Sequence, residues 1–154
     1  MYERVLLAYD GTREGRTALR EGALLAKRCN ASVFLLCVVA ETPGVRLGEA
    51  AHAGAIAHTQ DTYGGIFDEA MSRLTTLGFK AEGCVAQGEP AETIAAYARQ
   101  VRADLVVVGH RRQSLLERWW SGSSGAYLVD HLGCSLLIAR NSISDAAFTS
   151  EIEG

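Results

Sequence analysis

Short apolar segments alternate with segments of helical periodicity along this chain, and that alternation restricts the fold more than any other feature. The apolar segments are rich in Val and Leu, and they occupy Val5–Tyr9, Val33–Val39, Leu105–Val108 and Leu136–Ala139. Nearly continuous apolar runs of this kind are typical of strands buried on both faces, as in a parallel sheet covered by helices. The more polar segment Lys80–Ala86 fits an edge strand of the same sheet.

Between the predicted strands, apolar side chains recur at the spacing of one helix face. The stripes run over Ala18–Cys29, Tyr63–Leu77, Ile94–Val101 and Ala126–Leu132. Pro90 precedes the third stripe, as is favoured at a first helical position, and Gly133 closes the fourth. Strands and helices therefore alternate from the first strand to the fifth, which predicts an α/β fold with right-handed crossovers.

Three segments interrupt this alternation. Glu41–Ala51 is the longest irregular connection, and Gly64 and Gly65 predict a bend or a later start in the second helix. Asn141–Gly154 has no basic residue and little apolar content. We therefore expect one domain over residues 1–140 and a loose C-terminal tail over residues 141–154.

Charge and composition argue against several classes of protein. The net charge of −3 gives no overall electrostatic reason to bind nucleic acid or an anionic membrane. No apolar stretch approaches the roughly 20 residues of a membrane span, and the start does not resemble a signal peptide, so we expect a cytoplasmic protein. The cysteines form no C-x-x-C pair and the histidines lack metal-ligand spacing, which predicts free thiols and no metal site.

A basic segment between two glycine-containing sites follows the fourth predicted strand. Gly109 ends that strand, and Gly122-Ser123-Ser124-Gly125 opens the last helical stripe. Glycines let main-chain amides approach a ligand closely, and a helix N-terminus carries unpaired N–H donors and a partial positive charge. After a strand, this combination favours an anion site, most often one for phosphate.

The end of the first predicted strand carries a different chemistry. It reads Asp10-Gly11-Thr12. In an open parallel sheet, ligands bind beyond the carboxyl ends of the strands, where the strand order reverses. If the first and fourth strands flank that point, Asp10 faces the phosphate site across one crevice. A carboxylate repels phosphate but accepts hydrogen bonds from ribose hydroxyls, so the two strand ends together indicate a nucleotide.

Other nucleotide-related classes fit poorly. The chain has no G-x-x-x-x-G-K-[ST] and no G-x-G-x-x-G after its first strand, which argues against a P-loop and a dinucleotide fingerprint. A phosphoacceptor receiver domain needs an Asp ending the third strand and a Lys ending the fifth, where this chain has Gln87-Gly88 and Arg140-Asn141. No catalytic Ser/His/Asp or Cys/His arrangement is legible, so we predict no catalytic residue and favour a binding protein over an enzyme.

At this level of detail the chain resembles the universal stress protein family, from about Glu3 to Arg140. The matching segments are Val5–Thr12, Leu35–Val38, Gly88–Ile94 and Val106–His110. The resemblance implies a Rossmann-like, three-layer fold. Its five-stranded parallel sheet has the order 3-2-1-4-5, with helices on both faces.

The nucleotide signature of that family is G-x2-G-x9-G-[ST]. Gly109, Gly122 and Ser123 occupy its first, third and last positions, whereas Arg112 stands at the second glycine. An arginine there contacts phosphate through charge-assisted hydrogen bonds, or its side chain blocks the approach of the main chain. Both outcomes stay open, and we favour the first.

The resemblance implies a binding site for AMP or ATP, the latter with or without Mg²⁺, in a stress-response signalling or sensing module. Asp10 would accept the ribose hydroxyls with Thr12 beside it, and the main chain near Val38 would read the adenine, with Ala8 lining its pocket. The phosphates would lie against Gly109, Arg112, Gly122, Ser123 and Ser124. The resemblance also implies a homodimer through the edge of the last strand, which is apolar and otherwise unpaired.

Each of these features also has a purely structural interpretation. Asp10 fits a helix cap, Gly122–Gly125 fits an ordinary loop and N-cap, and the loop arginines fit a solvated surface. The altered signature and Trp119-Trp120 favour a nucleotide-free dimeric interaction protein as the alternative function. A slow ATP hydrolase is a further alternative.

Overall fold

The computed structural model describes residues 1–9, 19–40, 49–109, 123–140 and 143–154. Its centre is a parallel sheet of β1 (Arg4–Tyr9), β2 (Ser32–Ala40), β3 (Glu82–Gly88), β4 (Leu105–Gly109) and β5 (Ser135–Ala139). The strand order is β3-β2-β1-β4-β5, which confirms the predicted order, and β3 is an edge strand as expected. Each strand begins or ends within two residues of its predicted bounds.

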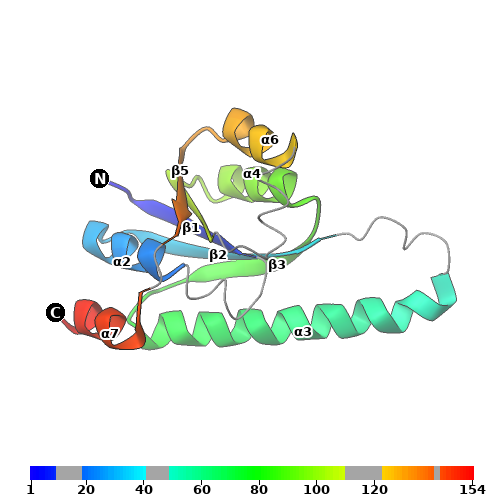
Figure 1. The fold of residues 1–154 in the computed structure, drawn as a ribbon, viewed down its shortest axis with the longest axis horizontal. Coiled ribbons are helices and arrows are strands. Elements are labelled where there is room, and N and C mark those ends of the chain that lie inside the picture. The colour runs from blue at the N-terminus through cyan, green and yellow to red at the C-terminus, as the bar shows by residue number, and fades with distance from the viewer. Residues whose placement is uncertain (10–18, 41–48, 110–122, 141–142) are drawn as a thin grey trace.

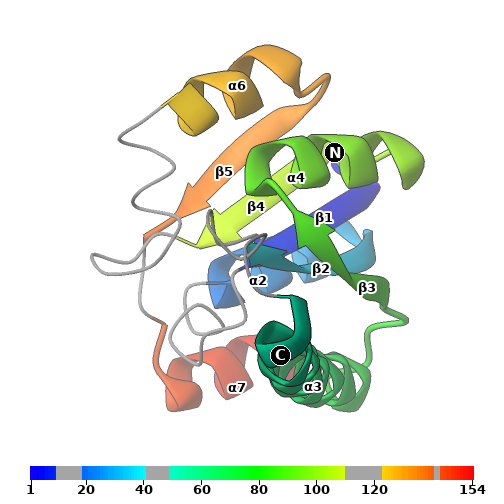
Figure 2. The same ribbon diagram turned by 90° about the vertical axis from the view of Figure 1, so that its right-hand side faces the viewer.

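Helices cover both faces of the sheet, which gives the predicted three layers (Figure 1). One face carries α2 (Arg20–Cys29), α3 (Glu49–Thr76) and α7 (Asp145–Glu153). The other face carries α4 (Pro90–Gln100) and α6 (Ser123–His131), which lie against each other. Figure 2 shows the two layers above and below the twisted sheet.

Alternate residues of the central strands pack on opposite faces of the sheet. Val5 and Leu7 belong to the core beneath α2, α3 and α7, whereas Leu6 and Ala8 belong to the core beneath α4 and α6. All four side chains are at most 2% exposed. Because both faces are covered, every position of the strand favours an apolar residue, which explains the continuous apolar runs in the sequence.

Helix α3 runs through both glycines that we expected to bend it or delay its start. It begins at Glu49 and continues to Thr76, so the later start is wrong. Tyr63, Phe67 and Leu74 anchor its second half against the core. Each helical glycine costs about 0.5–1 kcal/mol relative to alanine. The burial of these large apolar side chains outweighs that cost, since one buried aliphatic or aromatic side chain contributes about 1.5–3 kcal/mol.

The C-terminal segment is a helix rather than the loose tail that we expected. The Ser144 side chain caps α7 by accepting a hydrogen bond from the Ala147 N–H at 3.2 Å. Phe148 is buried in the core beside α2, and Ile143 and Ile152 pack against the same cluster. The low apolar content of the segment was misleading, because these apolar side chains suffice to hold a short helix in place.

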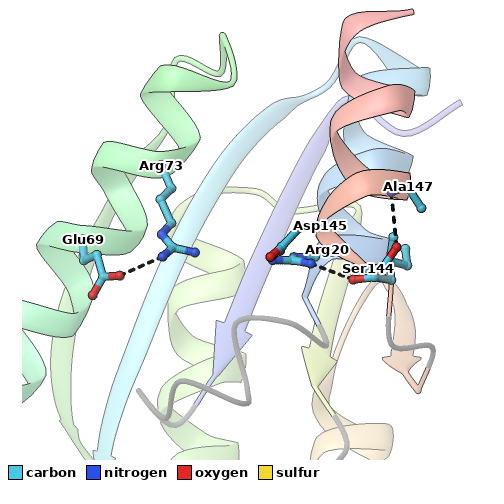
Figure 3. Close-up of polar contacts among 7 residues, drawn as sticks. Arg20, Glu69, Arg73, Ser144, Asp145 and Ala147 are labelled. Carbon is cyan, nitrogen blue, oxygen red and sulfur yellow. Dashed lines mark hydrogen bonds and ion pairs between the residues drawn. The ribbon is translucent and has the colours of Figure 1, made fainter.

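The Arg20 side chain of α2 holds α7 against the domain (Figure 3). Arg20 donates a hydrogen bond to the Ile143 carbonyl oxygen at 2.7 Å and pairs with Asp145. Its guanidinium also lies 5.4 Å from the centre of the Phe148 ring, within the range of a cation–π contact. The Arg20 side chain is only 17% exposed, so these contacts hold it in a largely buried position.

Candidate functional site

The carboxyl ends of β1, β2 and β4 lie side by side at one edge of the sheet. Ala8 pairs with Leu36 on one side and with Val108 on the other, and Gly109 pairs with Ala139 one residue further along. The chain passes from β1 to β2 and β3 on one side and returns to β4 on the other. The strand order therefore reverses between β1 and β4, as we predicted from the sequence, and this is where ligands bind in open α/β sheets.

The end of β2 offers main-chain groups at the same edge. Cys37 is the last residue of β2 that pairs with β1, whereas β2 continues to Ala40. Within the described residues, Val38, Val39 and Ala40 pair with β3 alone. The end of β2 therefore extends beyond the described part of β1.

Two predicted site residues are buried in the core by their side chains. Ala8 is 0% exposed and Val38 is 1% exposed, and both pack in the core beneath α4 and α6. Any recognition by these two residues must therefore use the main chain. The sequence interpretation likewise assigns recognition near Val38 to the main chain, and the place of Ala8 in the lining of the same pocket stays a prediction.

The predicted phosphate residues fall partly within the described chain. Gly109 is the last residue of β4 and is buried, and Ser123 and Ser124 form the first turn of α6. Because α6 connects the carboxyl end of β4 to the amino end of β5, its N-terminus lies at the same edge of the sheet as Gly109 (Figure 2). The first main-chain N–H groups of any helix have no intrahelical partner, and a helix N-terminus favours anions.

The remaining predicted site residues are Asp10, Thr12, Arg112 and Gly122. All of them lie outside the described residues. The structure therefore brings together Ala8, Val38, Gly109 and the start of α6, and Asp10 follows β1 in the sequence.

The start of α4 lies at this edge of the sheet. Its contacts explain the residue types at Gly88, Glu89 and Pro90. The Glu89 carboxylate accepts a hydrogen bond from the Glu92 N–H at 2.8 Å, and Pro90 follows as the first helical residue. Gly88 has φ +152°, and a Cβ atom there would lie 2.9 Å from the Thr93 hydroxyl oxygen. Pro90 marks the helix start in the sequence, but the Glu89 cap was not predicted. An acid next to a proline at a helix start was the available signal for that cap.

The shifted pKa values among the described residues belong to groups away from this edge. Burial raises the pKa of Tyr97 to about 12, and the neighbouring Cys84 adds to the shift. Burial also raises the pKa of the Cys134 thiol, with a smaller effect from Asp104. Tyr97 and Cys134 both pack against the core beneath α4 and α6.

The described residues show neither a metal-binding cluster nor a helix that spans a membrane. Within them, no group of three or more His, Cys, Asp or Glu side chains could hold a metal ion. None of the helices in the described ranges is both long and apolar enough to cross a membrane. The cysteines Cys29, Cys37, Cys84 and Cys134 are free thiols, as predicted.

Comparisons with known proteins agree with this architecture. A universal stress protein of Methanocaldococcus jannaschii is 25% identical over 144 residues, which cover 91% of this chain and 83% of that protein. A universal stress protein of Thermus aquaticus is 28% identical over 140 residues, covering 91% of this chain and all of that one. The solved structure of the Lactobacillus plantarum protein UspA has a TM-score of 0.71 and 25% identity, covering 90% of this chain and 98% of UspA.

Two further solved structures share the fold and contain nucleotides. An Arabidopsis thaliana universal stress protein with AMP bound has a TM-score of 0.63 and 19% identity, covering 94% of this chain and 98% of its own. The Archaeoglobus fulgidus protein in complex with dAMP has a TM-score of 0.59 and 20% identity, covering 90% and 98%. The sequence profile of the universal stress protein family matches residues 1–140, and the chain therefore belongs to that family.

Proposed function

We propose that this protein binds an adenine nucleotide, AMP or ATP, at the carboxyl edge of its sheet and acts as a stress-response signalling or sensing module. The observation that carries the proposal is the reversal of strand order between β1 and β4, with Gly109 ending β4 and the N-terminus of α6 at the same edge. The family relatives with AMP or dAMP bound support the choice of an adenine nucleotide.

The ligand would span the gap between the two strand ends. Its adenine would hydrogen-bond to the main chain near Val38, where β2 extends beyond its last pair with β1. Asp10 and Thr12 would hold the ribose. The phosphates would lie against the main-chain amides of Gly109 and Gly122 and against Ser123 and Ser124, because anions are stabilised at a helix N-terminus.

Arg112 is the residue on which the proposal departs from the family signature. We infer that its guanidinium contacts the phosphates, since arginine forms charge-assisted and often bidentate hydrogen bonds to phosphate. With ATP, Mg²⁺ would share the charge of the β- and γ-phosphates. Substituting Arg112→Gly restores the family residue, and we expect it to weaken nucleotide binding; tighter binding would show that Arg112 obstructs the site.

The direct test is a calorimetric titration of the full chain with AMP, ADP and ATP, each with and without Mg²⁺. We expect saturable heat with at least one of them and its loss in an Asp10→Ala variant. A control variant, Asp130→Ala, removes an acid from the exposed side of α6 and should leave the affinity unchanged. The absence of heat at millimolar nucleotide would contradict the proposal and favour the nucleotide-free alternative.

We also propose a homodimer that forms through β5. This strand is at the edge of the sheet, and Leu136, Leu137 and Ile138 are only partly buried there. Val129 of the adjoining α6 is 60% exposed. An apolar edge strand is stabilised when a second copy covers it, and a two-fold axis is the commonest way to do so.

A further inference from the structure

A cavity lies on the face of the sheet opposite to α4 and α6, between α3 on one side and α2 with α7 on the other. Its volume is about 620 Å³. Helix α3 packs on β2 and β3, whereas α2 packs on β1 and β2 and against α7. The cavity lies between the two helices, over Leu7 of β1 and Leu35 of β2, which are each 2% exposed. Protein interiors rarely contain voids much larger than a water molecule, whereas sites for small organic ligands measure about 300–1,000 Å³.

The inner wall of this cavity is apolar. Leu7 of β1 and Leu35 of β2 form the floor, Leu74 and Leu77 come from α3, and Phe148 comes from α7. The family profile covers residues 1–140, so Phe148 and the rest of α7 lie outside it. The cavity is therefore partly built by a segment that the family domain does not include.

Charged side chains stand at the two sides of the cavity (Figure 3). Arg20 reaches it from α2 and Arg73 from α3, together with Glu69 one turn earlier on α3. Arg20 is held by the Ile143 carbonyl oxygen and by Asp145. Arg73 pairs with Glu69 at 3.1 Å, and both side chains of that pair are well exposed, at 62% and 44%.

The Arg73–Glu69 pair leaves Arg73 able to bind an anion. An exposed pair at this helical spacing contributes only a few tenths of a kcal/mol, so its loss costs little. The contact with Glu69 is made by one terminal nitrogen, and a guanidinium has five N–H donors in a planar fork that fits a carboxylate. The hydroxyl-bearing residues Ser72 and Thr76 of α3 also border the cavity and add polar groups on the same side.

From this arrangement we infer a second ligand site, which takes a small amphipathic carboxylate with an aliphatic body. The aliphatic part fills the space over Leu7 and Leu35, and the carboxylate pairs with Arg73 at the opening. Arg73 is charge-complementary to an anion, whereas a cationic or neutral head group would leave the guanidinium without a new partner. The site lies on the other face of the sheet from the proposed nucleotide contacts, so the two proposals can be tested independently.

The test uses sodium decanoate, below its micelle concentration, in calorimetric titrations of the full chain. We expect saturable binding of decanoate and none of decyltrimethylammonium, which has the same tail and a positive head group. Arg73→Gln should weaken decanoate binding about fivefold, corresponding to about 1 kcal/mol. Arg99→Gln is the matched control, because it removes an exposed arginine from α4 on the opposite face and should leave the affinity unchanged.

A second variant tests the cavity itself. Ala70 borders it and is 8% exposed, so Ala70→Leu places extra methyl groups inside and should abolish decanoate binding. The far-ultraviolet circular dichroism spectrum should be the same in the full chain and in both Arg73→Gln and Ala70→Leu, which shows that these variants are folded. Failure of decanoate to bind at millimolar concentration, or equal binding of the cationic analogue, would overturn the inference. So would a dimer that dissociates when decanoate is added, because a second copy would then have been the occupant.

Discussion

Gly22 is the point at which α2 comes closest to the sheet. A Cβ atom at this position would lie 2.7 Å from the Cγ1 atom of Val107 and 2.8 Å from the Cδ2 atom of Leu7. Both neighbours are almost fully buried, so neither side chain has free space into which it could move. A hydrogen atom in place of a side chain therefore lets α2 pack directly over the pair formed by β1 and β4.

We expect Gly22→Ala to destabilise the fold by about 1–3 kcal/mol, which is typical of overpacking a core. Gly65→Ala is the matched control, because Gly65 is an exposed position inside α3 where a Cβ atom would meet nothing within 4 Å. That variant should stabilise the protein by about 0.5–1 kcal/mol, the helix preference of alanine over glycine. Urea denaturation of both variants measures the difference, and equal effects would contradict the close packing at Gly22.

Tyr97 makes the stability depend on pH in the alkaline range. Burial raises its pKa to about 12 in the folded protein, from an ordinary value of about 10 in the unfolded chain. The folded state therefore retains this proton where the unfolded state loses it. The resulting stabilisation is fully present below about pH 10 and is lost as the pH rises from about 10 to 12.

A Tyr97→Phe variant removes that dependence. Between about pH 10 and 12 its free energy of unfolding should fall less steeply with pH than that of the unsubstituted protein, as measured by urea denaturation. Below about pH 9 the two curves should run parallel. Identical slopes across the whole range would show that the hydroxyl titrates alike in the folded and unfolded states.

At the scale of elements, the strands could be predicted well and two helices could not. The strands are encoded in their own residues, because burial on both faces requires apolar side chains at every position from Val33 to Val39. The stability of α7 depends instead on contacts with α2 that are distant in sequence, above all those of Arg20 with Ile143 and Phe148. No local pattern contains that information. The same applies to α3, in which core packing outweighs Gly64 and Gly65.

Phe148 is the residue that should hold α7 in place. We expect Phe148→Ala to destabilise the protein by about 3 kcal/mol, at the lower end for a buried phenylalanine, because the ring lies at the margin of the core. Thr149→Ala changes an exposed neighbour on the same helix and should alter the stability by less than about 0.5 kcal/mol. Thermal unfolding followed by circular dichroism measures both effects. Similar midpoints for the two variants would show that α7 does not unfold cooperatively with the rest of the domain.

At the scale of the whole molecule, part of the candidate site could be predicted because it follows from topology. The reversal of strand order brings Gly109 and the end of β1 together whatever their side chains are. The roles of Asp10, Thr12, Arg112 and Gly122 stay predictions from the sequence, since these residues lie outside the described chain. The cavity over Leu7 and Leu35 could not be predicted, because it arises from the spacing of three helices that are far apart in sequence.

The proposed dimer is also a property of the whole molecule. The Ser135 N–H donates to the Asp104 carbonyl oxygen at 3.2 Å on the β4 side. Main-chain groups of successive strand residues point to opposite edges, so those of Leu136 point to the open edge of β5. We expect a dimer in sedimentation at micromolar concentration and a shift toward monomer in Leu136→Pro, which loses an outward N–H and keeps the bonds to β4. A folded, fully dimeric Leu136→Pro variant, or a monomeric parent protein, would contradict an interface at β5.

The fastening of α7 by Arg20 has a practical consequence for anyone who shortens the gene. The family profile ends at residue 140, which suggests residue 140, just after β5, as the end of a shortened protein. Such a truncation would remove Phe148 and Ile152 from the core on this face of the sheet. The Arg20 side chain, now largely buried, would become exposed to water beside leucine side chains that had lost their cover. The shortened product should aggregate on concentration, whereas the same protein with its last helix stays dispersed.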